Sequence, residues 1–222
     1  MIVNSMYMGF DDGGGGGETQ TGYSEEKMLY YYDGISKNMF YFRGSILSPH
    51  SDKTYYARPN SSTGATIEAY IQMDGASRSA YSRGFSLGSN AFCIAFGNGG
   101  GSSGSDYRYN PMIYWGANID YDIFPSGLIY GDKHSFAIVS APDLAETDPN
   151  TLRFYIDGVQ VGEEKSQNRN VEWSEGYLTV EGSTNRPLNG TVFNGRFYTR
   201  ALSVDELLAN HQNDITKYGG NS

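Results

Sequence analysis

The sequence predicts an all-β protein in which antiparallel strands form a sandwich, followed by one short C-terminal helix. Composition is the first reason: 29 of the 222 residues are Gly and 19 are Tyr, while only 18% are charged. A helical bundle needs more Ala, Leu, Glu and Lys than this, and a disordered chain would not carry 14% aromatic residues. The second reason is that short apolar or alternating runs recur between Gly, Pro, Asn, Asp and Ser. Without amphipathic helices between them, such runs favour antiparallel strands over βαβ units.

Runs of this kind are predicted to be strands along most of the chain after residue 27. The single cysteine, Cys93, lies in one of them and is expected to be a small buried residue rather than a reactive thiol. The predicted strands are Met28 to Tyr32, Asn38 to Arg43, Thr66 to Met73, Ala91 to Phe96, Pro111 to Trp115, Ser135 to Ser140, Leu152 to Ile156, Val159 to Glu163, Tyr177 to Glu181 and Thr191 to Thr199.

The Asp157-Gly158 pair predicts a β-hairpin. Asp-Gly tolerates the positive φ angles of a two-residue type I′ turn, whose twist matches that of paired strands. If Ile156 faces Val159 across this turn, then Phe154 faces Val161, and all four side chains fall on one side of the ribbon. Turn chemistry and side-chain alternation therefore predict the same register.

A capping box predicts where the helix begins. The Ser203 hydroxyl can accept the backbone N–H of Glu206, and the Glu206 carboxylate can accept that of Ser203. The helix is expected to run to about Asn213. The side chains available to one face of it are Val204, Leu207, Leu208 and His211.

The chain is expected to divide into three parts. Residues 1–23 form a flexible N-terminal peptide with a Gly-rich tether at Gly13–Gly17, because glycine loses the most backbone entropy on ordering. Residues 24–218 form the folded domain, and residues 219–222 form a disordered tail. Residues 1–10 are apolar enough to be a docking peptide, and a disordered terminus is the alternative interpretation.

The charge of the chain excludes two classes of partner. Lys plus Arg total 16 and Asp plus Glu total 25, which gives a formal net charge of −9. Nucleic acids and anionic membranes are bound mainly through cationic side chains, so neither is an expected partner. No run approaches the ~20 apolar residues of a membrane span, and the N-terminus lacks the basic start of a secretory signal. The protein is therefore expected to be made in a cytoplasm, with no sequence-encoded route of export.

Four motifs occur in a set order in the second half of the chain. They are Lys133–Val139, the hairpin Leu152–Val161, Tyr177–Gly182, and Leu188–Ser203 with Glu206 and Asn210 beyond it. In this order and spacing they resemble the laminin-G-like group of the concanavalin A-like lectin/glucanase superfamily. Thr66–Ile71 is similar to an upstream strand of that group, so the resemblance covers roughly residues 28–215.

This resemblance implies a two-sheet antiparallel jelly roll, whose concave face and rim loops often bind carbohydrate or another protein. The matching motifs are turns, core strands and a helix cap, so they carry over the scaffold and little ligand chemistry. The sequence departs from the group at Tyr70, where Trp is usual, and at Asn194, where an acidic residue is usual. The calcium-coordinating acidic positions of some members are not recognisable.

The sequence predicts that the chain is not an enzyme. A retaining glycosidase needs two carboxylates ~5 Å apart, and the glucanases of this superfamily carry theirs at alternate positions of one strand. That signature is missing, since Glu163 and Glu164 point to opposite faces if their strand continues. No arrangement of a Ser or Cys nucleophile is recognisable near the histidines, which are His50, His134 and His211.

Aromatic residues that follow a Gly-rich segment form the candidate ligand site. Sugar rings stack their apolar C–H faces on Tyr and Trp, while their hydroxyls bond to Asn, Asp and Arg. The alternative is that some of these aromatic residues are structural, because Tyr is common in strands. The candidate ligand-binding residues are Tyr107, Arg108, Tyr109, Trp115, Asp120, Tyr121 and Asp122.

No catalytic residue, metal ligand or cofactor is assigned from the sequence. Calcium is the one ion for which oxygen ligands lie close together along the chain. Sites for this ion draw six or more oxygens from loops, so the alternative interpretation is a set of solvated loop acids. The residues concerned are Asp106, Asn118, Asp120 and Asp122.

The leading functional hypothesis is a non-catalytic, virion-associated surface, adhesion or decoration module of a bacteriophage-like particle. Leu29–Ile35 resembles the start of laminin-G-like phage structural proteins, and a virion protein needs neither an export signal nor disulfides. It would be assembled in the host cytoplasm and would bind a glycan or viral structural proteins, and the sequence leaves a homo-oligomer open. The two alternatives are a carbohydrate-binding lectin domain of a secreted, extracellular bacterial protein and a divergent glycoside hydrolase.

Overall fold

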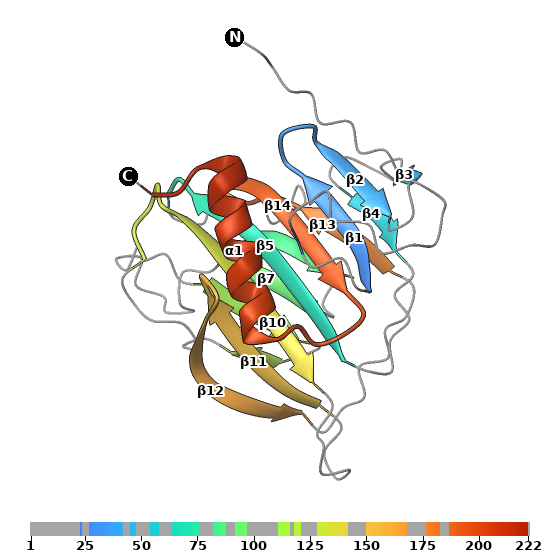
Figure 1. Cartoon of the computed structure of the whole chain (residues 1–222), viewed down its shortest axis with the longest axis vertical. Coiled ribbons are helices and arrows are strands. Elements are labelled where there is room, and N and C mark those ends of the chain that lie inside the picture. The colour runs from blue at the N-terminus through green and yellow to red at the C-terminus, as the bar shows by residue number, and fades with distance from the viewer. Residues whose placement is uncertain are drawn as a thin grey trace.

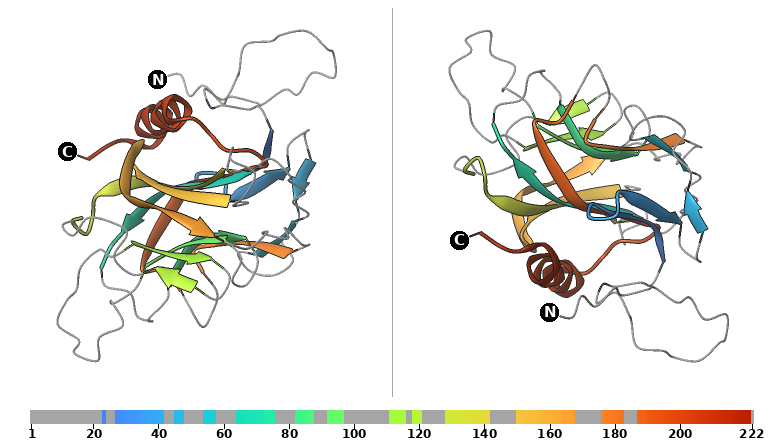
Figure 2. Two further views of the ribbon diagram at one scale, coloured as in Figure 1. Left: turned by 90° about the horizontal axis from the view of Figure 1, so that it is seen from below. Right: turned by 90° about the horizontal axis from the view of Figure 1, so that it is seen from above.

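Two antiparallel β-sheets stack face to face, and one helix lies across the outer face of the larger sheet (Figure 1). In this computed structural model the described residues are 23, 27–41, 45–47, 54–57, 64–75, 82–87, 92–96, 111–115, 118–120, 128–141, 150–167, 176–182 and 187–221. End-on views place the helix on one side of the sandwich and the smaller sheet on the other (Figure 2). The predicted fold class, an antiparallel two-sheet sandwich with a C-terminal helix, is confirmed.

The larger sheet, called the large sheet below, is built from β1 (Met28–Asp33), β2 (Asn38–Tyr41), β3 (Ser45–Leu47), β5 (Ala65–Met73), β10 (Lys133–Ala141), β11 (Asn150–Ile156), β12 (Val159–Gln167) and β14 (Gly190–Tyr198). Its strand order is β12-β11-β10-β5-β14-β1-β2-β3. The small sheet is built from β4 (Thr54–Ala57), β6 (Ser82–Leu87), β7 (Phe92–Phe96), β8 (Pro111–Trp115), β9 (Asn118–Asp120) and β13 (Gly176–Val180), in the order β4-β13-β6-β7-β8-β9. The helix is α1 (Val204–Tyr218).

The main apolar core fills the space between the two sheets. Strand alternation sends every second side chain of the large sheet inward, including Ile67 and Phe197, which have no exposed surface. Phe136 of the large sheet meets Phe96 of the small sheet edge to face, with ring centroids 5.3 Å apart. Cys93 is buried, as predicted. The small sheet contributes Phe85, Leu87, Ile94, Phe96, Leu178 and Val180 to this core.

The predicted hairpin is confirmed between β11 and β12. Its turn residues Asp157 and Gly158 have φ angles of 55° and 77°, which are the positive angles that a type I′ turn needs. The register pairs Phe154 with Val161 as expected. The residue that follows the turn, Val159, is 63% exposed, because the hairpin ends at the edge of the large sheet.

Helix α1 begins where the capping box predicted. Ser203 Oγ accepts the Glu206 backbone N–H at 3.3 Å, and Glu206 Oε2 accepts the Ser203 backbone N–H at 2.9 Å. The helix runs past the predicted end at Asn213 and stops at Tyr218, where the N–H of Gly219 donates to the Ile215 carbonyl. The capping box therefore predicts the start of this helix, and its end coincides with Gly219, whose φ of 80° ends the helical backbone.

The buried face of α1 differs from the prediction. Leu207 is buried as expected, but Val204 and Leu208 are 49% and 44% exposed. The helix instead buries Asn210 and Asp214 against the sheet. The reason is that the outer face of the large sheet beneath α1 carries charged groups, so polar side chains of the helix fit there better than apolar ones.

The chain beyond α1 stays in contact with the sheet. Lys133 Nζ donates to the Tyr218 carbonyl at 2.7 Å, and Asn221 Oδ1 accepts the Lys133 backbone N–H at 2.6 Å. Residues 219–221, expected in a disordered tail, are therefore tied to β10. Residues 1–22 lie outside the described residues, so the expected N-terminal peptide and domain division stay predictions. No helix in the described part is both long and apolar enough to cross a membrane.

Replacing Gly158 by Ala is expected to destabilise the protein more than replacing Gly131 by Ala. Both residues have positive φ, which costs an alanine about 1 kcal/mol. A Cβ on Gly158 would also lie 2.8 Å from Leu208 Cα, whereas one on Gly131 would meet nothing within 4 Å. We expect a loss of about 2 kcal/mol or more for Gly158→Ala, measured by urea denaturation. Equal losses in the two variants would contradict this close packing of the turn on α1.

Candidate functional site

A buried ion-pair cluster joins α1 to the outer face of the large sheet. Arg196 of β14 donates from Nε to Glu68 Oε2 on β5 at 3.0 Å. Its two terminal nitrogens donate to the two carboxylate oxygens of Asp214 on α1, each at 2.7 Å. The side chains of Arg196 and Asp214 have no exposed surface, and that of Glu68 is 1% exposed. This bidentate geometry is the strong form of an arginine–carboxylate interaction.

Neutral side chains satisfy the remaining hydrogen-bonding positions around these charges. Asn210 Nδ2 on α1 donates to Glu68 Oε2 at 2.9 Å. Asn194 Nδ2 and Tyr23 OH both donate to Asp214 Oδ1, at 2.7 and 3.0 Å. A buried ion pair is stable only when such additional bonds compensate for lost hydration. The cluster therefore depends on groups from two strands, the helix and the N-terminal segment.

Burial and mutual charge shift the titration of these groups. Burial raises the pKa of Glu68 above its usual range, and the Arg196 charge offsets this only in part. Burial opposes the charged form of Arg196, but Asp214 and Glu68 outweigh it and raise the pKa of the guanidinium well above its usual range. Burial, and then the charge of Asp214, also raises the pKa of Tyr23. Arg196 thus stays charged and Tyr23 stays protonated at physiological pH.

The cluster is enclosed, so it cannot act on a substrate. Glu68 and Asp214 flank one arginine, and a pair of carboxylates is what glycoside hydrolysis requires. Such a pair must also reach a sugar and a water molecule, whereas both of these carboxylates lie buried between α1 and the sheet. The arrangement is therefore a packing centre that fixes the helix on the sheet.

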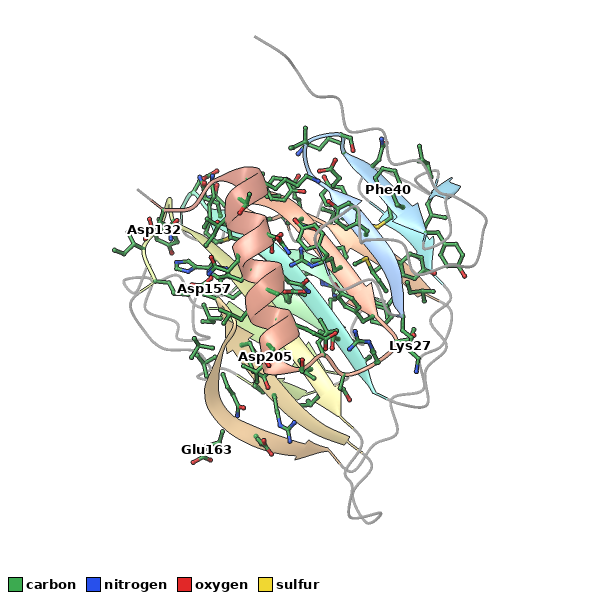
Figure 3. All side chains as sticks on the ribbon, in the orientation of Figure 1. Lys27, Phe40, Asp132, Asp157, Glu163 and Asp205 are labelled. Atoms are coloured by element: carbon green, nitrogen blue, oxygen red, sulfur yellow. The ribbon has the colours of Figure 1, made fainter. Side chains whose placement is uncertain are left out.

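A second polar group lies beside the hairpin turn, where Asp157 is seen next to α1 (Figure 3). Ser135 Oγ is 2.9 Å from His211 Nδ1, and Asp157 Oδ1 is 3.5 Å from the same nitrogen. Asp157 Oδ2 is 2.8 Å from His134 Nδ1. A nucleophile relay needs the serine and the aspartate on opposite nitrogens of the histidine ring. This group therefore orients the turn and does not activate Ser135, which is only 3% exposed.

The outward face of the small sheet carries a row of small side chains. Thr179 of β13 pairs with Ser86 of β6, and Ser86 pairs with Cys93 of β7. Chain neighbours such as Phe85 and Leu178 point into the core, so alternation turns this row outward. Ser86 Oγ is buried and has no hydrogen-bond partner within the part of the chain that the structure describes. A buried hydroxyl of this kind calls for a partner such as a water molecule or a ligand.

Two of the predicted ligand residues lie on neighbouring strands of the small sheet. The backbone of Trp115 ends β8 and pairs with Phe92 of β7 and Asn118 of β9. The backbone of Asp120 ends β9 and pairs with Ile113. The candidates outside the described residues are Tyr107, Arg108, Tyr109, Tyr121 and Asp122.

The calcium ligands considered from the sequence are not brought together by any described contact. Asp106 and Asp122 lie outside the described residues, and Asn118 and Asp120 share strand β9. Among the residues with described positions, no group of three or more His, Cys, Asp or Glu is placed to hold a metal ion.

The sequence did not mark the residues that organise this outer face. Asp214 carried a usable signal, because Leu207, Asn210 and Asp214 are spaced to share one face of a helix. Arg196 carried none, since its partners Asp214 and Glu68 lie 18 and 128 residues away along the chain. Contacts between residues this far apart in the sequence depend on strand pairing and helix docking, and local sequence patterns do not predict them.

Solved structures share this fold. Domain 4 of an extracellular GH43 arabinanase from Geobacillus stearothermophilus, in complex with arabinotriose, matches with a TM-score of 0.53 at 12% identity, over 82% of this chain and 97% of that one. A Trypanosoma rangeli sialidase in complex with sialic acid matches with a TM-score of 0.54 at 11% identity, over 89% of this chain but only 34% of its own. Neither a protein-family model nor a curated protein sequence matches this chain. Such identities establish the fold alone, and the laminin-G-like resemblance stays a prediction.

These matches overturn the prediction that the chain is not an enzyme. The fold recurs in an arabinanase and in sialidases, whose names denote glycoside hydrolases. The prediction used the absence of one local signature, in which both carboxylates lie on a single strand. Carboxylates from distant strands can meet without any such signature, so its absence does not exclude hydrolysis.

Replacing Asp214 by Ala is expected to cost about 3–5 kcal/mol of unfolding free energy, because it leaves the buried Arg196 charge without its bidentate partner. The matched control is Arg153→Ala, which removes an ion pair with Glu164 whose side chains are 38% and 47% exposed. The control should cost less than about 1 kcal/mol. Urea denaturation measures both values. A small, equal loss in the two variants would show that the cluster does not hold α1 in place.

The fold is expected to lose stability at alkaline pH. Burial raises the pKa of Tyr70 to about 12, whereas an unfolded tyrosine titrates near pH ~10. Between these values the unfolded state releases a proton that the folded state keeps, so stability falls as pH rises from about 10 towards about 12. Tyr70→Phe should flatten this decline, measured as urea midpoints across that range. An unchanged slope in Tyr70→Phe would contradict this assignment.

Proposed function

We propose that this chain is a carbohydrate-binding domain whose ligand face is the outward side of the small sheet. The observation that carries the proposal is the arabinanase domain, a sugar-complexed domain that shares the fold over 97% of its length. Because the match spans almost the whole of that domain, the sugar bound to it suggests which class of ligand a domain of this fold binds.

The position of α1 supports the choice of face. The inner faces of both sheets form the core, and α1 covers the outer face of the large sheet over its central strands. The outward side of the small sheet lies across the sandwich from α1 (Figure 2). The row of Thr179, Ser86 and Cys93 on this face is buried, so the proposed sugar contact lies beyond this row, at β8 and β9.

The residue types on the adjoining strands suit a sugar. Trp115 pairs through Phe92 with the core residue Leu87, so its position belongs to the inward row of the small sheet. The β8 residue in the outward row of Ser86 and Cys93 is Tyr114, an aromatic type on which the apolar face of a sugar can stack. The flanking segments hold the remaining proposed ligand residues, which are Tyr107, Arg108, Tyr109, Tyr121 and Asp122.

Calorimetric titration of the full chain with arabinotriose and with sialyllactose tests the proposal. Binding of at least one of them is expected. Tyr114→Ala should weaken that binding about tenfold, the effect of losing one aromatic stacking contact.

The matched control is Gln212→Ala, which alters an exposed side chain on α1 across the sandwich. Its affinity should equal that of the unmodified protein. If neither sugar binds, or if Gln212→Ala weakens binding as much as Tyr114→Ala, the proposed ligand face is wrong.

Glycoside hydrolysis by this chain is a second candidate function. The sialidase match, which covers 89% of this chain, is the observation that favours it. Release of 4-nitrophenol from a 4-nitrophenyl arabinofuranoside or sialoside would support it if Asp120→Asn abolished that release. Turnover that persists in Asp120→Asn would place hydrolysis elsewhere in the sequence or in a contaminant.

The placement of the protein in a virion stays a prediction from the sequence, as does its alternative, an extracellular protein. Mass spectrometry of purified phage particles tests the first placement. The proposed sugar binding is compatible with either location, because a particle surface and an extracellular protein both meet glycans.

A further inference from the structure

Tyr23 fixes the point at which the N-terminal segment joins the folded body. Its side chain is 2% exposed, and its hydroxyl donates to Asp214 Oδ1 at 3.0 Å. The Arg196 guanidinium lies 4.4 Å from the centre of its ring, and the ring of Tyr31 on β1 lies 5.9 Å away. Residues 1–22 are therefore attached at a defined point on the outer face of the large sheet, beside α1.

An apolar strip leads away from this point across β1, β2 and β3. Tyr31 pairs with Arg196 on one side and with Phe40 on the other, and Phe40 pairs with Ile46. Directly paired residues share one face of a sheet, so Tyr31, Phe40 and Ile46 form one row, which we call the β1–β3 strip. The rings of Tyr31 and Phe40 are 6.0 Å apart.

The side chains of the β1–β3 strip become more exposed to solvent with increasing distance from Tyr23. Tyr31 is 6% exposed, Phe40 is half-buried, and Ile46 is 60% exposed. Figure 3 shows Phe40 on β2, clear of the helix that covers the middle of the sheet. Tyr23 and Lys217 of α1 thus cover the strip only at Tyr31, and its part over β2 and β3 offers apolar surface to a further occupant.

The segment that supplies Tyr23 also holds side chains suited to the rest of the strip. We infer that residues 1–10 of this chain bind in cis to the β1–β3 strip over Phe40 and Ile46. Methionine side chains are unbranched and adapt to irregular apolar surfaces, and an aromatic ring can stack against Phe40. The apolar residues of this peptide are Ile2, Val3, Met6, Met8 and Phe10.

Tether length favours this occupant over a second copy of the protein. Residues 11–22 link the peptide to Tyr23 and can extend over at most about 40 Å. Neighbouring strands are ~4.8 Å apart, so the strip from β14 to β3 spans only about 15 Å. A short flexible tether gives a local concentration of roughly millimolar, far above that of a second molecule in dilute solution. Five consecutive glycines, Gly13–Gly17, allow the chain to turn back on itself.

Hydrogen exchange of the full chain, followed by mass spectrometry at two protein concentrations, tests the inference. Exchange of amides in residues 1–10 should be slowed about tenfold relative to the free peptide, as expected for a local millimolar concentration and a roughly 0.1 mM dissociation constant. Ile46→Asp should abolish this slowing, because it places a charge in the apolar strip. Phe10→Asp should also abolish the slowed exchange, because it places a charge in the peptide itself.

The matched control is Val159→Asp, which alters an equally exposed apolar residue, 63% against 60%, on the far edge strand of the same sheet. It should leave the slowed exchange unchanged. Three results would overturn the inference: no slowing in the unmodified chain, slowing that survives Ile46→Asp, or slowing that increases with protein concentration, which would identify a second copy as the occupant.

Discussion

The fold depends on the buried guanidinium of Arg196, which Glu68 and Asp214 hold from two sides. A charge at that depth is costly unless both carboxylates arrive with good geometry, so the sheet and the helix have to assemble around it together. β14 cannot slip by one residue along β5, because the slip would turn Arg196 into the apolar core. One side chain therefore links the register of the central strands to the position of a helix that follows later in the chain.

This constraint determines which surfaces are free for binding. Over its central strands the large sheet is occupied on both faces, by the core on one side and by α1 on the other. Two surfaces of the described part remain for the proposed contacts, the outward side of the small sheet beyond its buried row at Thr179, Ser86 and Cys93, and the β1–β3 strip. They lie on different sides of the sandwich (Figure 2), so a sugar on the first and the N-terminal peptide on the second would not compete.

Short sequence motifs predicted local structure, but they did not predict contacts between segments that lie far apart in the sequence. The turn at Asp157 and the cap at Ser203 were predicted because each motif contains its own hydrogen-bonding partners. The inner face of α1 was mispredicted, because apolar spacing selected Leu208 where the sheet, through Arg196, requires Asp214. The same limit affected the candidate site, because the row of Thr179, Ser86 and Cys93 on β13, β6 and β7 is formed only by strand pairing. The exclusion of catalysis failed for this reason too, since a local signature cannot report carboxylates contributed by separate strands.

The central claim is that the Arg196 cluster commits one side of the sandwich to packing and leaves the outward side of the small sheet to bind sugar. Backbone amide chemical-shift mapping of the isotope-labelled full chain with arabinotriose tests it most directly. The claim predicts shifts concentrated in β6, β7, β8 and β9, with α1 and the β1–β3 strip unchanged. Shifts centred on α1 or on the hairpin turn at Asp157 would contradict it.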